Sequence, residues 1–360
     1  MNHQYKNTAV ICLSQNNGGM ELASVKLARL LSSDVPIDFI AKKDSYIELN
    51  SNHQFELHNI NLHTIPFDKF FSFKLIKEIR KIIIDRKIKN IIFLGASEMR
   101  SLYFATYGLE INFIIRQGSK KTSSKKDFIH KILYSKVNHF MGNCEYIKQN
   151  IIDIIPLAKE TNVNRIYSSL KIPKDIITKK YNGIIDIILV GRIHPFKGQL
   201  EAIKSCEILY ENNIKFNVKF LGDTQDVNYY NQIEFYLKTC KYKDSIEFVG
   251  YTNNVQKYLQ QSDIFLFPSL GEGMSNAIIE ALGFGIIPII YDDTSSPEFK
   301  HLGFHIYLTE ENTLKNLKDK LLNVALNIQE EKNKAFSNIK LAQNIFAPSR
   351  EKDEYLNLLI

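Results

Sequence analysis

Short apolar runs alternate with amphipathic stretches along most of the chain. In the first half, runs typical of buried strands fall at 9–13, 35–41, 90–94 and 112–116, with a weaker one at 55–60. Residues 20–32 and 73–86 carry apolar side chains at helical spacing, which predicts amphipathic helices between the strands. Regular alternation of strand and helix predicts an α/β fold built on a parallel sheet.

The same alternation starts again after residue 180. Residues 184–190 form a near-continuous apolar run, which is typical of a parallel strand covered on both faces. Further strands are predicted at 216–221, 246–249, 264–267 and 286–291, and helices at 199–211, 229–239, 313–329 and 335–346. Residues 168–180 have neither pattern and are interpreted as a linker. The chain is therefore expected to form two doubly wound Rossmann-like domains, at residues 1–170 and 171–346.

The composition is that of a globular protein large enough for two cores. The chain has 360 residues, of which 44% are hydrophobic and 24% charged. Its net charge of +7 suits an anionic ligand or surface, but does not distinguish a nucleotide from a membrane or a nucleic acid. No aromatic RNP motif, helix-turn-helix signal or zinc-finger spacing supports a nucleic-acid-binding protein, so no nucleic-acid partner is expected.

Three features of the sequence favour a cytoplasmic location. The four cysteines are scattered without a Cys-x-x-Cys pair, so neither a disulfide framework nor a structural metal is expected. Residues 1–7 are polar and lead directly into a strand-like run, unlike a signal peptide. No apolar stretch approaches the length of a membrane span, so any membrane contact is expected to be peripheral.

The stretch 264–291 predicts a β–loop–α–β unit with a candidate ligand site. Its loop carries two glycines and ends at Ser275 or Asn276, either of which suits the start of a helix at 277–282. The free N–H groups and the dipole of that helix would favour an anion beyond the end of the strand. Two carboxylates, Glu272 and Glu280, bracket the helix start.

Two other predicted strands of the second domain end in suggestive residues. Gly191 and Arg192 follow the first strand, with Lys197 five positions later, and Tyr251 follows the strand at 246–249. Ligands bind beyond the carboxyl ends of parallel strands. There, Arg192 and Lys197 would present two positive charges to a diphosphate, although either cation alone is more often a surface residue.

The two motifs together resemble family 4 of the retaining glycosyltransferases. The phrase from Glu272 to Glu280 is similar to the Glu-x7-Glu motif of that family, and the segment 191–198 to its Gly-Arg…Lys-Gly signature. The resemblance covers 184–304 well and the first domain mainly in topology. It implies a GT-B fold, in which two Rossmann-like domains face each other across a cleft. It also implies that a last helix, within 347–360, packs back on the first domain.

The resemblance also implies roles for individual residues. Arg192 and Lys197 would bind the donor diphosphate, Glu272 the hydroxyls of the donor sugar and Glu280 the ribose. The other donor-binding positions it implies are Gly19, Gly191, Tyr251, Gly273, Met274, Ser275 and Asn276. Two of these keep a plain alternative, since Gly19 fits an ordinary flexible turn and Tyr251 fits a core position equally well.

Arg116 marks a departure from the family pattern. Many relatives have a histidine at the end of the strand corresponding to 113–116, and here residues 115–119 contain none. Arg116 or Gln117 takes that role, or the acceptor side is built differently. Because a guanidinium stays protonated, Arg116 would act by position or by charge rather than as a base, which would suit an acceptor carrying phosphate or carboxylate.

The segment 120–136 is unusually basic. It holds six lysines against a single acidic residue, Asp127, and its later part is amphipathic. It is either a solvated lysine face on an ordinary helix or a patch that meets an anionic membrane or a phosphate-bearing acceptor.

The expected function is that of a retaining glycosyltransferase that moves a hexose from a nucleotide sugar, with UDP as the expected nucleotide. The resemblance implies a saccharide or lipid-linked glycan acceptor in bacterial surface polysaccharide or lipopolysaccharide biosynthesis, with the enzyme in the cytoplasm or at the inner face of the membrane. Neither a metal nor a cofactor is expected, because the sequence has no Asp-x-Asp motif and no ligand cluster with metal spacing. A nucleotide-sugar epimerase on the same architecture is the alternative.

Overall fold

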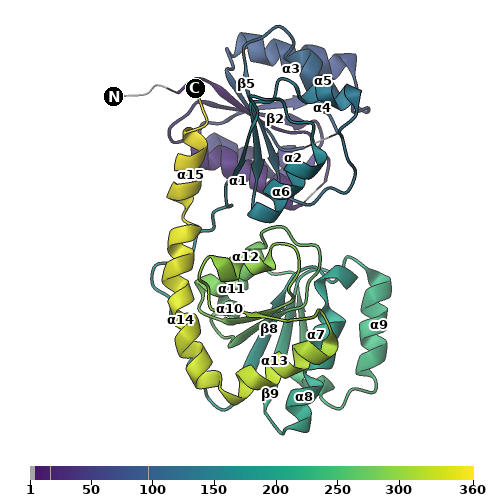
Figure 1. Ribbon diagram of the computed structural model, residues 1–360, viewed down its shortest axis with the longest axis vertical. Helices are drawn as coiled ribbons and strands as arrows, with labels where there is room; N and C mark the ends of the chain where they lie inside the picture. Colours follow the sequence, from purple (N-terminus) through teal and green to yellow (C-terminus); the bar gives the residue numbers. More distant parts are fainter. Residues whose placement is uncertain (1–4, 17, 96) are drawn as a thin grey trace. The chain divides into compact units, whose positions relative to one another are not determined.

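The computed structural model describes residues 5–16, 18–95 and 97–360, which divide into two compact units. The first unit combines the chain up to Ser168 with Pro348–Ile360, and the second is Ser169–Ala347. Residues 1–4 of the polar start and Asn17 of the first glycine-bearing loop lie outside the described residues. Each unit is an α/β structure around its own parallel sheet, so the two predicted Rossmann-like domains are confirmed (Figure 1).

The first unit contains a seven-stranded sheet in the order β3-β2-β1-β4-β5-β6-β7. Its strands are β1 Thr8–Cys12, β2 Ile37–Lys42, β3 Asn61–Ile65, β4 Asn90–Phe93, β5 Asn112–Gln117, β6 His139–Gly142 and β7 Asn162–Arg165. The helices between them are α1 Gly19–Leu31, α2 Tyr46–Leu57, α3 Phe73–Asp85, α4 Met99–Ala105, α5 Phe128–Tyr134 and α6 Glu145–Ile154. The central strands β1 and β4 are buried along their whole length, because helices cover both faces of a parallel sheet.

One predicted strand is wrong. Residues 55–60 were expected to be extended, but 55–57 form the last turn of α2, and the strand follows at β3. Ser45 accepts a hydrogen bond from the Glu48 N–H and so caps the start of α2. The weak apolar run reflects the buried face of this helix, where Phe55 packs against Phe39 of β2 with ring centroids 4.8 Å apart.

The second unit contains a six-stranded parallel sheet in the order β10-β9-β8-β11-β12-β13. Its strands are β8 Ile185–Val190, β9 Phe216–Leu221, β10 Ile246–Gly250, β11 Ile264–Phe267, β12 Ile287–Ile290 and β13 Tyr307–Leu308. Its helices are α7 Gln199–Ser205, α8 Glu207–Glu211, α9 Val227–Leu237, α10 Val255–Leu259, α11 Asn276–Gly283, α12 Ser296–His301, α13 Leu314–Leu326 and α14 Ile328–Ile345, with 3-10 turns η1 Pro195–Lys197 and η2 Lys243–Ser245. The strand order reverses between β8 and β11, which makes the carboxyl ends of these two strands the expected ligand edge.

The last helix, α15 (Pro348–Leu356), belongs to the first unit. Glu351 forms an ion pair with Lys26 of α1 at 2.9 Å, and Tyr355 is fully buried in the core beside the sheet. The chain then reaches β4, where the side-chain amide of Asn90 donates to the Ile360 carbonyl at 3.2 Å. Leu170 N–H donates to the Phe346 carbonyl at 2.9 Å, so the two ends of the second unit lie side by side.

Within the described residues, no helix is both long and apolar enough to cross a membrane.

Candidate functional site

Three neighbouring strands of the second unit end in glycine at the same edge of the sheet. Gly191 follows β8, Gly222 follows β9, and Gly250 ends β10. The Gly191 N–H donates to the carbonyl of Leu221 at 2.8 Å, and the Gly222 N–H to the carbonyl of Gly250 at 2.9 Å. A Cβ on Gly222 would lie 2.2 Å from the Gly191 carbonyl oxygen. Gly222 therefore has no room for a side chain, and main-chain groups of all three glycines lie at the edge where α/β sheets bind ligands.

The loop between β8 and α7 supplies two cations. Arg192 is exposed, and its main-chain carbonyl accepts a hydrogen bond from the buried Gln199 side chain at 2.9 Å. Lys197 ends the turn η1. Its side chain lies next to the end of β8, as a Cβ on Gly191 would be only 3.5 Å from the Lys197 Cδ. The loop thus presents one cation at the strand end and one in solvent.

Gly198 joins this loop to the acidic loop that follows β11. Its φ of +69° is in the left-handed region, and a Cβ there would lie 2.3 Å from the Pro268 carbonyl oxygen. The Leu270 N–H donates to the Phe196 carbonyl at 2.8 Å and ties the same two loops together. Only glycine allows this approach, which brings Lys197 to the acidic loop.

Lys197 and Glu272, one from each of the two sequence motifs, are in direct contact. The Lys197 ammonium forms an ion pair with Glu272 Oε1, and the Ser269 hydroxyl lies 2.6 Å from the same oxygen. Both charged side chains are half-buried, and the ammonium also lies over the Phe267 ring, 5.4 Å from its centroid. The two motifs, which are 75 positions apart in the chain, therefore form one cluster at the carboxyl end of β11.

The loop that carries Glu272 is held by the segment after β12. Asp293 accepts a hydrogen bond from the Gly271 N–H at 2.6 Å. The hydroxyl of Thr294 donates to the Glu272 carbonyl, and that of Ser295 to the Gly273 carbonyl, both at 2.6 Å. These bonds fix the main chain just before α11, and they also give Asp293 a structural role in the loop.

Helix α11 starts at this loop and presents Glu280. Ser275 occupies the N-cap position without a side-chain capping bond, and Asn276 is exposed at the first helical position. Met274 and Ser275 are buried, so the loop offers mainly its backbone. Glu280 is half-buried, and burial raises its pKa to about 7. This carboxyl is poorly solvated, so hydrogen bonds from hydroxyl donors would stabilise its charged form.

Tyr251 follows β10 at the outer side of the edge. The side chain is two-thirds exposed, and its hydroxyl donates to Asn253 at 2.6 Å. It is therefore a surface residue of the second unit rather than the core residue that the alternative interpretation requires.

The remaining two predicted site residues belong to the first unit. Gly19 opens α1, and a Cβ there would meet nothing within 4 Å. Arg116 is only 8% exposed within β5, and its Nη2 donates to the Ser168 hydroxyl at 2.5 Å. Burial raises the pKa of Tyr355, and the neighbouring Arg116 guanidinium opposes that shift. Arg116 is thus engaged inside its own unit, where it joins the end of β5 to Ser168 and α15.

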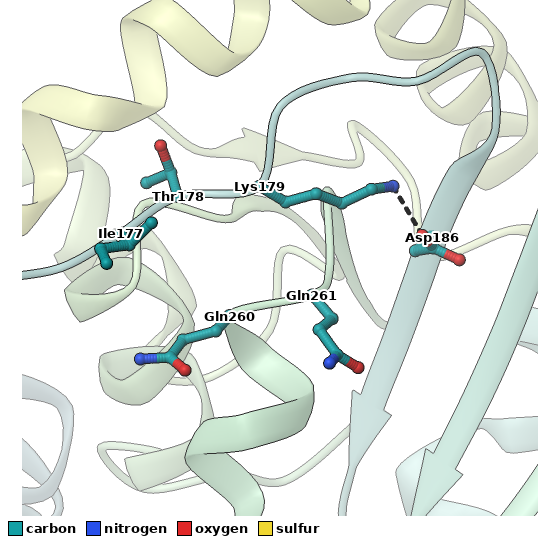
Figure 2. Close-up of a pocket in the computed structure, with 6 residues that line it drawn as sticks. All are labelled: Ile177, Thr178, Lys179, Asp186, Gln260 and Gln261. Atoms are coloured by element: carbon teal, nitrogen blue, oxygen red, sulfur yellow. Dashed lines mark hydrogen bonds and ion pairs between the residues drawn. The ribbon is translucent and has the colours of Figure 1, made fainter.

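Figure 2 shows a pocket of about 520 Å³ in the second unit that lies away from this cluster. Lys179 reaches Asp186 near the start of β8 and Asp263 just before β11, both at 2.6 Å. The pocket is therefore at the amino ends of the strands, opposite the glycine edge. Since two carboxylates already neutralise Lys179, we do not assign the pocket to the site.

The comparisons with known proteins agree with this geometry. Residues 172–341, nearly all of the second unit, match the family described as glycosyl transferases group 1. The second unit is therefore a domain of this family. The glycosyltransferase is also 27% identical, over 87% of its length and 90% of the relative, to the capsular polysaccharide biosynthesis glycosyltransferase CapH of Staphylococcus aureus.

Two further similarities cover more than nine tenths of the chain. One is to the Campylobacter jejuni N-acetylgalactosamine-N,N'-diacetylbacillosaminyl-diphospho-undecaprenol 4-alpha-N-acetylgalactosaminyltransferase, 23% identical over 93% of this chain and 97% of that protein. The other is to the crystal structure of Anabaena Alr3699/HepE in complex with UDP-glucose, with a TM-score of 0.75, 14% identity and 98% coverage of both chains. The glycosyltransferase therefore has the GT-B fold of its structural neighbours.

Several residues that build the site were not singled out in the sequence. Ser269, Asp293, Thr294 and Ser295 are polar residues in the loops that directly follow β11 and β12. Their position after buried strands is the signal that could have indicated them. Among the described residues, no three His, Cys, Asp or Glu side chains gather as a metal site would require.

Proposed function

We propose that this glycosyltransferase moves a hexose from UDP-hexose to a saccharide or lipid-linked glycan, with retention of anomeric configuration and without a metal ion. The bound UDP-glucose of the Anabaena protein supports the donor. The names of the Staphylococcus and Campylobacter relatives support an acceptor in bacterial surface polysaccharide or lipopolysaccharide biosynthesis, since one concerns capsule and the other a glycan on diphospho-undecaprenol.

The observation that carries this proposal is the cluster of Lys197, Glu272 and Ser269 beside Arg192. The donor diphosphate would bind between Lys197, Arg192 and the main chain of Gly191. Negative charge grows on the diphosphate as the glycosidic bond breaks, so cations fixed beforehand stabilise the transition state more than the ground state. The N-terminus of α11 adds a favourable potential at the same place.

Glu272 would both orient Lys197 and accept hydrogen bonds from the donor sugar. Its carboxylate holds the ammonium in place before the donor arrives. The main chain of Gly273 and Met274, with Ser275 and Asn276, would line the sugar and the phosphates. A phosphate oxygen of the donor would help to remove the acceptor proton, so no protein side chain has to serve as the base.

Glu280 would bind the ribose hydroxyls. A half-buried carboxyl with a raised pKa is poorly solvated, and two hydroxyl donors would stabilise its charged form. We further propose that Tyr251 lies beside the base and that Gly19 lets the main chain of the first unit approach the donor. Arg116 would act on the acceptor side by position or charge.

A panel of nucleotide sugars tests the donor. A rise in melting temperature with UDP and one UDP-hexose, but not with GDP or ADP sugars, is expected. Transfer to a glycan acceptor should then give a product whose anomeric configuration, read by NMR, equals that of the donor, and the rate should survive EDTA. Inversion at C2 of the donor without an acceptor would instead identify an epimerase, and a Mn²⁺ requirement would contradict the metal-free proposal.

The proposal also includes peripheral contact with the inner, anionic face of a membrane. Its support is the lysine excess of the segment 120–136, in which α5 lies. Five lysines of this segment form no ion pair with a carboxylate of the described residues: Lys121, Lys125, Lys126, Lys131 and Lys136. Lys125 instead donates a hydrogen bond to the Tyr134 hydroxyl at 3.2 Å.

A further inference from the structure

The first unit has a pocket of its own, formed by three segments that are distant in the sequence. It has a volume of about 620 Å³ and lies between the loop before α3, the start of α4 and helix α5. These helices contact one another in sequence order, at the end of the first unit where Figure 1 labels them together. The residues that line it are Lys69, Phe70, Phe71, Ser97, Met99, Arg100, Lys125, His130, Leu133 and Tyr134.

Basic side chains line the pocket, and acidic side chains do not. Lys69, Arg100 and Lys125 line it, and no carboxylate does. Within the ranges that the structure describes, none of the three forms an ion pair with a carboxylate, and the nearby Asp127 pairs with His130 instead. Burial, and then the neighbouring Lys121, lower the pKa of Lys125. This concentration of uncompensated positive charge favours an anionic ligand.

Large apolar side chains near the pocket are exposed to solvent. Exposed fractions are 61% for Phe70, 43% for Phe71, 81% for Phe73, 49% for Phe104, 75% for Phe128 and 55% for Ile129. Phe71 contacts the rings of both Phe73 and Phe104, with centroids 5.7 and 5.9 Å apart, so part of the set forms one patch. Large exposed apolar patches mark interaction sites.

We propose that this aromatic–cationic surface, the lining residues together with the exposed side chains just given, docks on an anionic phospholipid bilayer. The pocket would hold a lipid phosphate between Lys69, Arg100 and Lys125, and the phenylalanine side chains would insert among the acyl chains. The inference rests on the membrane contact proposed above and names the site that makes it.

A bilayer fits this surface better than a single-stranded nucleic acid does. Both offer phosphates to cations, and nucleic-acid bases stack on aromatic rings. Here, however, the exposed set includes the aliphatic Ile129 and Ile132 beside Phe128 on α5. Acyl chains accept aliphatic and aromatic side chains alike, and a cationic helix with such a face is typical of a membrane-surface helix.

Vesicle co-sedimentation of the full chain, without nucleotide sugar or acceptor, tests the proposal. Phosphatidylcholine vesicles should bind little protein, and the same vesicles with phosphatidylglycerol should bind much more. Lys69→Ser/Arg100→Ser should weaken this binding about 30-fold, because each charge near an anionic surface contributes about 5-fold. Phe70→Ser/Phe128→Ser should weaken it at least about 10-fold.

A matched control comes from the second unit. Phe235 is 75% exposed, and Lys238 and Lys241 are exposed near it, so Phe235→Ser/Lys238→Ser/Lys241→Ser removes similar groups elsewhere. This variant should bind vesicles as the parent does, and all variants should keep the parent's circular dichroism spectrum. The charge-conserving Lys69→Arg/Arg100→Lys should keep the binding.

Three results would overturn the proposal. The first is equal vesicle binding by the parent and the pocket variants. The second is an equal loss from Lys120→Ser/Lys121→Ser, whose side chains do not line the pocket, since this would indicate a diffuse basic surface. The third is stronger retention on a single-stranded oligonucleotide than on anionic vesicles. Because the assay contains no donor, a failed sugar-transfer experiment would leave its outcome unaffected.

Discussion

The two units open with the same β–loop–α arrangement, but their glycine-bearing loops are packed differently. In the second unit, the loop between β8 and α7 is tightly filled, and a Cβ on Gly198 would meet the Pro268 carbonyl oxygen. In the first unit, Gly19 at the start of α1 faces open space. The first kind of glycine is required by the fold, whereas the second is free to serve a ligand.

The cations of the two units differ in the same way. Lys197 is half-buried at the strand edge and held by Glu272, with Arg192 exposed beside it. Arg116 is buried and bonded to Ser168. The second unit therefore carries a polar edge that is assembled before any ligand binds, while the first unit uses its strand-end arginine to hold its own parts together.

The largest expected effect is on stability, when alanine replaces the glycine of each loop, Gly198 or Gly19. Gly198→Ala should lower the free energy of unfolding by about 3 kcal/mol, because strain at positive φ adds to a clash with rigid backbone. Gly19→Ala should leave it within about 0.5 kcal/mol. Urea unfolding of both variants measures this difference, and equal losses would end the distinction between the loops. A loss of sugar transfer in Gly19→Ala at full stability would indicate close ligand approach.

The next effect concerns donor binding. Lys197→Ala and Arg192→Ala should each weaken UDP binding by about 1.5 to 3 kcal/mol, the range for a charge-assisted contact. Isothermal titration of UDP measures this, with Lys204→Ala on the neighbouring helix α7 as a control cation. Unchanged UDP affinity in folded variants would remove both residues from the donor site.

Arg116→Ala tests whether the buried arginine also serves the acceptor. It should lower the free energy of unfolding by about 1.5 to 2 kcal/mol, because a buried charge-assisted bond to Ser168 is lost. It should also raise the acceptor KM with UDP affinity nearly unchanged, and Arg116→Lys should restore only part of it. A lower melting temperature with normal acceptor kinetics would confine Arg116 to a structural role.

The smallest expected effect is the pH dependence contributed by Glu280. Burial raises its pKa from 4.5 to about 7, so the folded state favours the neutral carboxyl. Its charged form therefore costs stability progressively as pH rises through this interval, and fully above pH 7. Glu280→Gln should gain about 1 kcal/mol over the parent at pH 8 and nothing at pH 4.5, allowing for partial exposure.

Melting curves from pH 4.5 to 8 check this sign. A stabilisation that does not change with pH would mean that packing, and not ionisation, causes it. The same variant should raise the donor KM more than it lowers kcat, whereas Glu272→Ala should mainly lower kcat, because Glu272 is expected to act at the transferred sugar.

The core of the second unit was predictable because its sequence patterns are local. The strand at 264–267 is continuous and apolar, and the two motifs beside it lie directly at strand ends. The rule that ligands bind at carboxyl ends predicted that Lys197 and Glu272 lie at the same edge of the sheet, but it did not predict the ion pair between them. The error at 55–60 arose because a buried helix face and a weak strand look alike over so few residues.

What was not predictable depends on contacts between distant segments. Asp293 and Thr294 hold a loop 22 residues earlier in the chain, and no local pattern announces such a bond. The aromatic–cationic surface joins the loop before α3 to α4 and α5, and only the lysines of the last segment were noticeable in the sequence. The burial of Arg116 depends on α15, which lies more than 200 positions later.

The return of the chain to the first unit has a consequence for synthesis. Because Leu170 bonds to Phe346 and the first unit closes around Tyr355, the second unit is in effect inserted into the first. A ribosome releases the whole inserted unit before it releases the helix that fills the core of the unit begun first. The first unit therefore lacks the helix that fills its core until the second unit has been made, so we expect the second unit to complete its fold first.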